Sequence, residues 1–167
     1  MGMFANIKDA KASFDNNYFR DGHYIWQILN IKADKNRKGI PYIAVECKVI
    51  HVFDDSAGTG HKLREEAAWV LTSDKDSFLG NIKAFVSHTV GCDANDVTEE
   101  GCDALCGPSQ PLAGFFVESH NRTQVAKSGK PFCKVGWKRS WSEEEVKELV
   151  GAEQWAVLFG GASVAVE

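Results

Sequence analysis

The sequence lacks the segments that mark membrane-spanning or exported proteins. No apolar run approaches the roughly 18 residues that a membrane-spanning helix requires, and the apolar stretch 155–159 is followed at once by Gly160 and Gly161. The first residues contain no basic region followed by an apolar segment, and Asn6 stands where a myristoylation signal needs Ser or Thr. We therefore expect a soluble protein with no export signal, no lipid anchor and no membrane partner.

Cysteine is too scarce and too irregularly placed for a disulfide framework. The chain has five cysteines, an odd number, and their spacing follows no regular pattern. In a chain without an export signal, such cysteines are more often reduced thiols than disulfide partners. The expected location is the reducing cytoplasm.

Internal repeats, low-complexity tracts and linkers are also missing. The 167 residues include 25% charged and 11% aromatic side chains, which is typical of an ordinary folded domain. This composition excludes a disordered chain, a collagen-like repeat and a coiled coil, and the length is that of one domain. We expect a single domain over residues 1–167, with an N-terminal arm at 1–22 and a peripheral C-terminal helix and tail at 141–167.

Runs of β-branched and aromatic residues predict five strands. In residues 41–53 apolar positions alternate with more polar ones, so one face should lie in the core and the other should face solvent or ligand. The apolar positions are Ile43, Val45, Cys47 and Val49. The predicted strands cover residues 23–34, 41–53, 62–74, 111–120 and 131–140.

Between the third and fourth strands the hydrophobic period changes to about 3.6 residues, which predicts helices. The first of them follows the potential N-caps Asp74 and Asp76 and ends at Gly91. A second, acidic helix is predicted over residues 96–106 and ends before Gly107. This segment forms a helical insertion between two groups of strands.

A third helix is predicted after the last strand. Ser142 and Glu145 have the spacing of a capping box, and Trp141 can pack against Val146. The pattern predicts a helix over residues 143–150 that ends at Gly151.

The order of elements is that of an OB-fold. We expect a mainly β protein with helical insertions: a five-stranded Greek-key barrel with helices between strands three and four and a further helix at the C-terminal side. OB-folds bind ligands across strands two and three, and between the loops that join strands one to two and four to five. Other small β-barrels and α+β sandwiches have the same order of elements.

Basic residues are concentrated in two segments, although the formal net charge is −4. No acid interrupts the stretch from His120 to Trp141, and the turn after the first strand is also basic. In an OB-fold both segments would be the hairpins that border the ligand groove. The cations are Lys35 and Arg37 in the first segment and Arg122, Lys127, Lys130, Lys134, Lys138 and Arg139 in the second.

A basic groove with stacking side chains suits sequence-tolerant binding of a single-stranded nucleic acid, because phosphates supply the electrostatic attraction and bases supply stacking. Tyr42, on the same strand face as Lys48, is the best stacking candidate. The other interpretation is that the lysines are solvated and the aromatic residues are core, which we expect for Trp26 and Trp69; for Trp137 both interpretations stand. The candidate site comprises Tyr42, Lys48, Arg122, Lys127, Lys130, Lys134, Trp137 and Lys138.

Three runs resemble the small OB-fold proteins that bacteriophages encode within replication and recombination modules. They are GHYIWQILNIKADKNRKGIPYIAVECKVI, SFLGNIKAFVSHTVG and LAGFFVESHNRTQVAKSGKPFCKVGWKRS, within about residues 22–140. Proteins of that kind bind single-stranded DNA or are candidates for that role. The resemblance implies a DNA-binding protein that acts without catalysis in the cytoplasm of an infected bacterium. Self-association, contacts with replication or recombination proteins, and RNA as the ligand are further expectations to test.

The sequence contains no complete motif for catalysis, nucleotide binding or metal binding. Residues 58–62 lack the Gly-Lys-Ser/Thr ending of a phosphate loop. His88 and Cys92, like Cys102 and Cys106, are four residues apart, which leaves a metal site open, although the closer pairs of structural zinc sites are missing. We expect no enzymatic activity and no cofactor. The competing hypothesis is a structural or protein-interaction module of a phage or bacterium, with its acidic helices as the contact surface.

Overall fold

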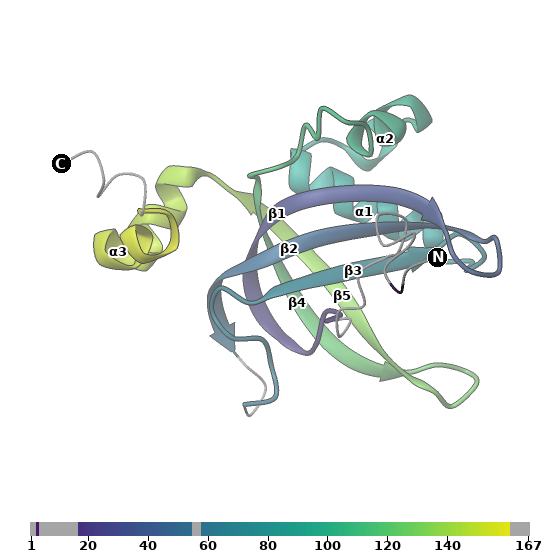
Figure 1. Ribbon diagram of the computed structural model, residues 1–167, viewed down its shortest axis with the longest axis horizontal. Helices are drawn as coiled ribbons and strands as arrows, with labels where there is room; N and C mark the ends of the chain where they lie inside the picture. The colour runs from purple at the N-terminus through teal and green to yellow at the C-terminus, as the bar shows by residue number, and fades with distance from the viewer. Residues whose placement is uncertain (1–2, 4–16, 55–57, 161–167) are drawn as a thin grey trace.

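The computed structural model describes Met3 and residues 17–54 and 58–160, which form a five-stranded antiparallel sheet with three α-helices (Figure 1). The predicted mainly β architecture with inserted helices is confirmed. None of the helices in these ranges combines the length and the apolarity needed to cross a membrane. In chain order the elements are β1 (Gly22–Lys35), β2 (Pro41–Asp54), β3 (Glu66–Thr72), α1 (Phe78–Val90), the 3₁₀-helix η1 (Ala94–Asp96), α2 (Glu99–Leu105), β4 (Phe116–Val125), β5 (Pro131–Trp141) and α3 (Glu143–Phe159).

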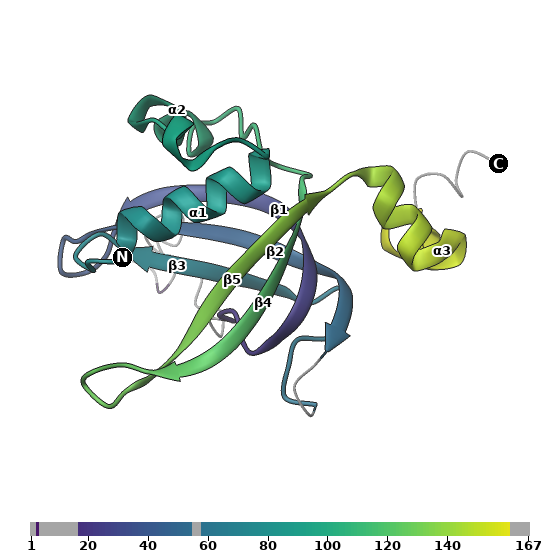
Figure 2. The same ribbon diagram turned by 180° about the vertical axis from the view of Figure 1, so that it is seen from behind.

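The strands are ordered β3-β2-β1-β4-β5 across the sheet, and every neighbouring pair is antiparallel. β1 is central, because it pairs with β2 along its length and with β4 over its first half. β3 and β5 are the two edge strands, so the sheet is open. Figures 1 and 2 both place the β1–β2 turn and the β4–β5 hairpin on one side of the molecule and α3 on the opposite side.

The inner face of the sheet carries the main hydrophobic core. Trp26 and Trp69 lie in it, as expected. Seen from behind in Figure 2, α1 lies beside the two edge strands, and its Phe85 ring is centred 5.5 Å from Trp69 of β3 and 4.8 Å from Trp137 of β5. Aromatic packing therefore joins the two edges of the sheet. The alternation predicted for β2 is confirmed, since the core includes Ile43, Val45, Cys47 and Val49.

Part of the segment that was predicted to be a separate arm belongs to the sheet and the core. Tyr18 forms a parallel bridge with Ala68 at the free edge of β3. The backbone N–H of Phe19 donates to the Ala68 carbonyl at 3.2 Å, and the Phe19 ring stacks on Trp26 with a centroid distance of 4.0 Å. These contacts cover the β3 edge, while residues 4–16 of the predicted arm lie outside the described residues.

The helical insertion differs from its prediction at the helix starts. α1 begins after Ser77, which makes no side-chain capping bond, and neither Asp74 nor Asp76 is its N-cap. The predicted helix over 96–106 is divided, because the Thr98 side chain accepts a hydrogen bond from the backbone N–H of Gly101 and starts α2 there. Before it, the Asp93 side chain caps the short η1. Capping bonds of this kind fix helix boundaries more closely than the apolar period does.

α3 begins as predicted but extends further. The capping box between Ser142 and Glu145 is present. Gly151 leaves the helical conformation with φ +86°, yet the chain returns to helix and continues to Phe159. This second half of α3 packs on the outer face of the sheet, opposite the main core. The contact forms a second, smaller hydrophobic cluster, whose buried residues are Ile25, Ile50, Phe116, Val146 and Leu158.

The connection between β2 and β3 is anchored by the buried His61. Its Nε2 accepts a hydrogen bond from the backbone N–H of Arg20 at 2.8 Å, and its Nδ1–H donates to the Glu65 carboxylate. The backbone N–H of His61 donates to the Tyr24 hydroxyl at 2.8 Å, so this amide is engaged within the fold. Burial lowers the pKa of His61, which favours the neutral ring in this network. Because these residues are held in a turn, the third strand starts at Glu66 and not at position 62.

Candidate nucleic-acid interface

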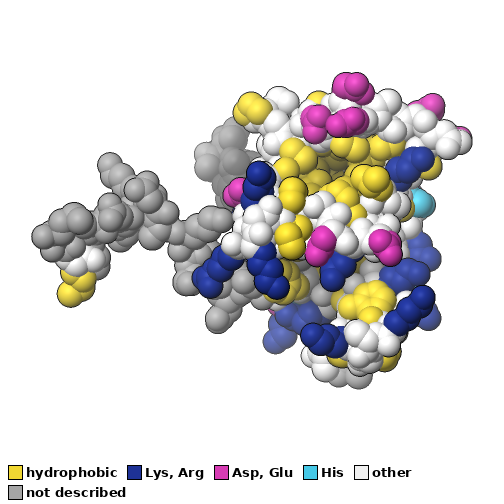
Figure 3. All heavy atoms as spheres, turned by 90° about the vertical axis from the view of Figure 1, so that its right-hand side faces the viewer, with side chains coloured by type: hydrophobic (Ala, Val, Ile, Leu, Met, Phe, Trp, Pro, Cys, Tyr) yellow, Lys and Arg dark blue, Asp and Glu magenta, His cyan; other side chains and the backbone are white. Residues whose placement is uncertain are grey.

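The β4–β5 hairpin carries most of the basic residues that the sequence analysis selected. Its tip is a tight turn in which the backbone N–H of Ala126 donates to the Lys130 carbonyl at 2.9 Å, and Gly129 has φ +85°. Lys127 and Lys130 are exposed at this tip. Figure 3 shows this side of the molecule, with Lys and Arg side chains around its lower half and acidic side chains at the top, at the level of α2.

The two faces of the hairpin differ sharply in composition. Val117, Val135 and Trp137 point inward and pack in the main core. Residues that alternate with them point outward, because successive side chains of a strand lie on opposite faces. We call the outward set the outer stripe; it consists of Glu118, His120, Arg122 and Gln124 in β4 and Phe132, Lys134, Lys138, Arg139 and Trp141 in β5.

Like charges lie next to one another on the outer stripe. Arg122 and Lys134 are exposed and stand directly opposite in the β4–β5 register, an arrangement that destabilises a strand pair. Within residues 17–54 and 58–160, no acid forms an ion pair with Arg122, Lys127, Lys130, Lys134 or Lys138. The fold therefore places five cations of the candidate site along one hairpin without pairing them with acids in the described ranges. A polyanion bound there would relieve the repulsion.

The position of Trp137 corrects the candidate site. Its side chain is only 7% exposed and lies between Trp69 and Phe85, so it presents no open ring face for a base. Trp137 points inward because it alternates regularly with Val135, which is also in the main core. A β-bulge between Glu118 and Ser119 makes Lys138 an additional residue on β5 and shifts the alternation only beyond Trp137. Exposed aromatic surface on this hairpin comes from Phe132, which is 45% exposed.

The base of the outer stripe is ordered by side-chain contacts. The Trp141 indole N–H donates to Glu118 Oε1 at 2.9 Å, and the Arg139 guanidinium lies 4.2 Å from the centre of the Trp141 ring. Arg139 also forms an ion pair with Glu145 at the start of α3. Glu118 Oε2 is 2.5 Å from His23 Nε2 on β1. These contacts hold the Trp141 ring in one orientation at the junction of β5 and α3.

A row of histidine and phenylalanine rings lies beside the outer stripe. The His23 ring is stacked on His120 at 5.0 Å and lies 4.4 Å from Phe53, which in turn contacts His51 at 4.5 Å. Burial, followed by the nearby Arg122, His23 and Lys138, lowers the pKa of His120. Burial and His23 lower the pKa of His51. Protonation of these rings would add positive charge to a surface that is already basic.

Lys48 is connected to the outer stripe, whereas Tyr42 is not. On the outer face, cross-strand neighbours run from Trp141 through Phe116 and Gln27 to Lys48. Tyr42 lies six positions from Lys48 on β2, about 20 Å along the strand, and its partners are Asp34 and Thr72. The structure thus places Lys48 beside the base of the outer stripe and leaves Tyr42 at a distant position on the same face of β2.

The basic turn between β1 and β2 has acids as neighbours. Lys35 and Arg37 are exposed, but Asp34 adjoins them and accepts a hydrogen bond from the backbone N–H of Lys35. Behind the turn, Lys32 forms an ion pair with Glu46 at 3.8 Å. This hairpin is therefore basic, but it has an acid, Asp34, beside its cations.

Candidate metal ligands do not converge. In the two described ranges, no three His, Cys, Asp or Glu side chains are placed so that they could hold a metal ion. Cys102 and Cys106 pack against the main core, and burial raises the pKa of each thiol. All five cysteines belong to the described residues and are free thiols.

Comparisons with known protein families and with curated proteins give no match for this chain. The site therefore has to be interpreted from its own geometry.

Sequence reasoning missed His23, Phe53 and His120, whose rings are brought together from three strands. Arg139 and Trp141 were noted as basic or aromatic but were not selected. For β5, the inward-facing set Val135 and Trp137 was detectable from period-two alternation, but the bulge at Lys138 was not.

Proposed function

We propose that this protein binds single-stranded DNA in a sequence-tolerant manner and without catalysis, through the outer stripe, the hairpin tip and Lys48. The observation that carries the proposal is the set of five cations that the β4–β5 hairpin presents without an ion-pair partner in the two described ranges. Phosphates attract such cations, and release of condensed counterions drives binding.

Aromatic side chains supply the second requirement for binding single strands. Phe132 lies beside Lys134 and Arg122, and Trp141 lies at the other end of the outer stripe. From Glu118 to Gln124 the stripe follows β4 for about 20 Å, at about 3.4 Å per residue. This length accommodates several nucleotides whose bases stack on the rings while phosphates contact the cations.

The architecture supports assignment to the OB-fold, which is a partly open five-stranded Greek-key barrel. The strand order and the helices between strands three and four agree with it. Core packing of Trp69 against Trp137, with ring centroids 5.0 Å apart, brings the two edge strands towards each other as closure of a barrel requires. Together with the resemblance over residues 22–140, this supports a role in phage replication or recombination in the bacterial cytoplasm.

Fluorescence anisotropy with labelled single- and double-stranded oligonucleotides at several salt concentrations tests the proposal. If all five hairpin cations contact phosphates, log K should fall with log salt with a slope of about −3.5, from about −0.7 per contact. Single strands should bind more tightly than duplexes, since stacking needs exposed bases. An affinity that does not change with salt would refute the proposal.

A protein-interaction module is the second candidate. It is favoured by apolar side chains that α1 and α3 expose, among them Leu79 at 72% and Val157 at 55%. Under this candidate, charge reversal in the β4–β5 hairpin would leave function intact, whereas changes among Glu143, Glu144 and Glu148 of α3 would abolish it.

A further inference from the structure

An open pocket of about 630 Å³ lies where the outer stripe meets α3. Its walls include Phe116 of β4, Trp141 of β5, and Trp155 and Phe159 of α3. The Trp155 and Phe159 rings are centred 4.4 Å apart, and Phe116 lies 6.1 Å from Trp155. The break at Gly151 allows the second half of α3 to bring its two rings to this place. The result is an aromatic wall beside the proposed DNA path.

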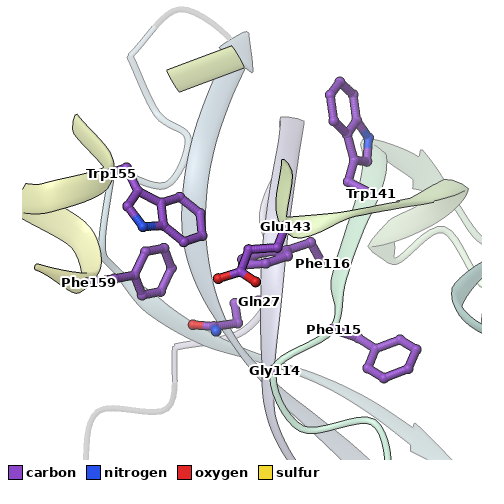
Figure 4. A pocket seen from close by; sticks show the side chains of 8 residues that line it. All are labelled: Gln27, Gly114, Phe115, Phe116, Trp141, Glu143, Trp155 and Phe159. Carbon is purple, nitrogen blue, oxygen red and sulfur yellow. The ribbon is translucent and has the colours of Figure 1, made fainter. Parts of the chain in front are cut away.

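Two polar side chains complete the pocket. Figure 4 shows the Glu143 carboxylate and the Gln27 amide both pointing toward Trp155 and Phe159. Polar groups that converge on an aromatic wall are typical of sites that orient a flat ligand. A carboxylate accepts hydrogen bonds only, whereas an amide both donates and accepts.

The pocket continues the proposed interface. Gln27 is the cross-strand neighbour of both Lys48 and Phe116, and Phe116 is the neighbour of Trp141. A strand that follows the outer stripe therefore reaches the pocket with Lys48 available for a phosphate. The acids of this region are partly balanced, because Lys147 lies 3.8 Å from Glu143 and Arg139 pairs with Glu145.

We propose that this pocket holds one unstacked guanine base of the bound single strand, an inference that rests on the proposed function. The Watson–Crick edge of guanine presents two adjacent N–H donors and one carbonyl acceptor. The donors match the two oxygens of Glu143, the acceptor matches the Gln27 amide, and the ring stacks on the aromatic wall. Thymine has one N–H between two carbonyls, so one of its oxygens would face the carboxylate.

The test compares oligo-dT of about 12 nucleotides with the same oligonucleotide carrying one central dG. The unmodified protein should bind the dG oligonucleotide roughly tenfold more tightly, the effect expected of one good bidentate pair. Glu143→Gln replaces one acceptor by a donor and should abolish this preference. Glu144→Gln is the matched control, because it removes the same charge from the same helical turn at a residue that does not line the pocket.

Equal affinity of the unmodified protein for the two oligonucleotides overturns the pocket assignment. A preference that survives in Glu143→Gln, or one that is lost equally in Glu144→Gln, overturns it too. In each of these cases, binding of oligo-dT itself leaves the proposed function standing. If oligo-dT does not bind at all, the proposed function fails. In that case titration of guanosine and thymidine, followed by tryptophan fluorescence, decides the pocket independently. A response to guanosine that is lost in Glu143→Gln supports it, and no response to either nucleoside refutes it.

Discussion

The two basic hairpins look alike in sequence but differ in the fold. The β1–β2 turn carries Lys35 and Arg37, yet Asp34 adjoins them and Glu46 pairs with Lys32 behind the turn. The β4–β5 hairpin carries Arg122 opposite Lys134, and neither has an ion-pair partner among the described residues. Local charge density alone therefore does not identify a polyanion site. The turn has Asp34 beside its cations, whereas no acid interrupts residues 120–141.

The hairpins also differ in what lies behind the cations. From the β4–β5 tip, the outer stripe leads to Trp141 and the pocket beside α3, with rings available along the way. At the β1–β2 turn, the nearest candidate ring is Tyr42, which faces Asp34 across the strand pair. The comparison predicts that nucleic acid binds along the first surface and not the second.

The largest expected effect concerns the inward face of the same β4–β5 hairpin. Trp137→Ala removes a ring that is buried between Trp69 and Phe85 and should cost about 3 to 5 kcal/mol of the free energy of unfolding. Thermal melting should show a decrease of about 10 °C or more. Trp137→Phe is the milder companion variant, and Phe132→Ala on the opposite face should melt close to the unmodified protein. A Trp137→Ala variant with unchanged melting would show that the ring is not part of the core.

The second effect tests the difference between the hairpins directly. The double variant Arg122→Glu/Lys134→Glu removes two phosphate contacts, each worth about eightfold in affinity at about 50 mM salt, so binding should weaken by about 60-fold or more. Lys35→Glu/Arg37→Glu is the matched control with the same change in net charge. Anisotropy titrations should show only a small loss for this control. Equal losses of affinity in the two variants would show that the two hairpins contribute alike to DNA binding.

The third effect separates stacking from charge. Phe132→Ala should weaken binding of single strands by about five- to 150-fold, the range for one stacked base, with the salt slope unchanged. Tyr42→Ala should leave affinity nearly unchanged, because Tyr42 lies on the surface that we exclude. A loss of affinity in Tyr42→Ala without a lower melting temperature would return Tyr42 to the site.

The smallest expected effect is a dependence of affinity on pH. His120 lies beside Arg122 and Lys138, and its pKa is lowered in the free protein, first by burial and then by these cations. Bound phosphate would favour the protonated ring, so affinity should rise between about pH 7.5 and about pH 5.5, by at most about eightfold for one added contact. His120→Gln should flatten this rise when binding is measured at constant salt.

Melting over the same pH range supplies the control. The pKa values of His51, His61 and His120 are lowered in the folded state, each first by burial. Their contribution to stability is therefore complete above about pH 6.5 and is lost as the pH falls toward the folded-state values. Stability should decrease with acidification while affinity increases, so a parallel decrease of both would argue against the role of His120.

Much of the fold could be predicted, because short-range patterns control it. The alternation through Val45 and Val49 placed β2 correctly, and the Ser142–Glu145 capping box fixed the start of α3. The prediction stopped α3 at Gly151, since glycine is the commonest residue just after the end of a helix. The helix resumes there and packs Trp155 and Phe159 against Phe116 on the sheet, a contact that local sequence does not encode.

The candidate site was predicted only in part, for the same reason. Arg122, Lys134 and Lys138 were found because a run of cations is visible in the chain itself. Trp137 was selected for the site although its ring points inward, and Trp141 was passed over although it ends the outer stripe. A single bulge opposite Glu118 sets the faces of the residues after Trp137, and its position follows from pairing between β4 and β5.

The sequence by itself determined the order of strands and helices and the concentration of positive charge between residues 122 and 139, because both depend on residues close together in the chain. The tertiary structure alone decided which cations form ion pairs across segments, which rings are exposed, and where Gln27 and Glu143 meet the rings of α3. These properties depend on strand register and packing between distant segments. Charge attraction and aromatic burial act through space, so their partners become known only once the sheet has brought the strands together.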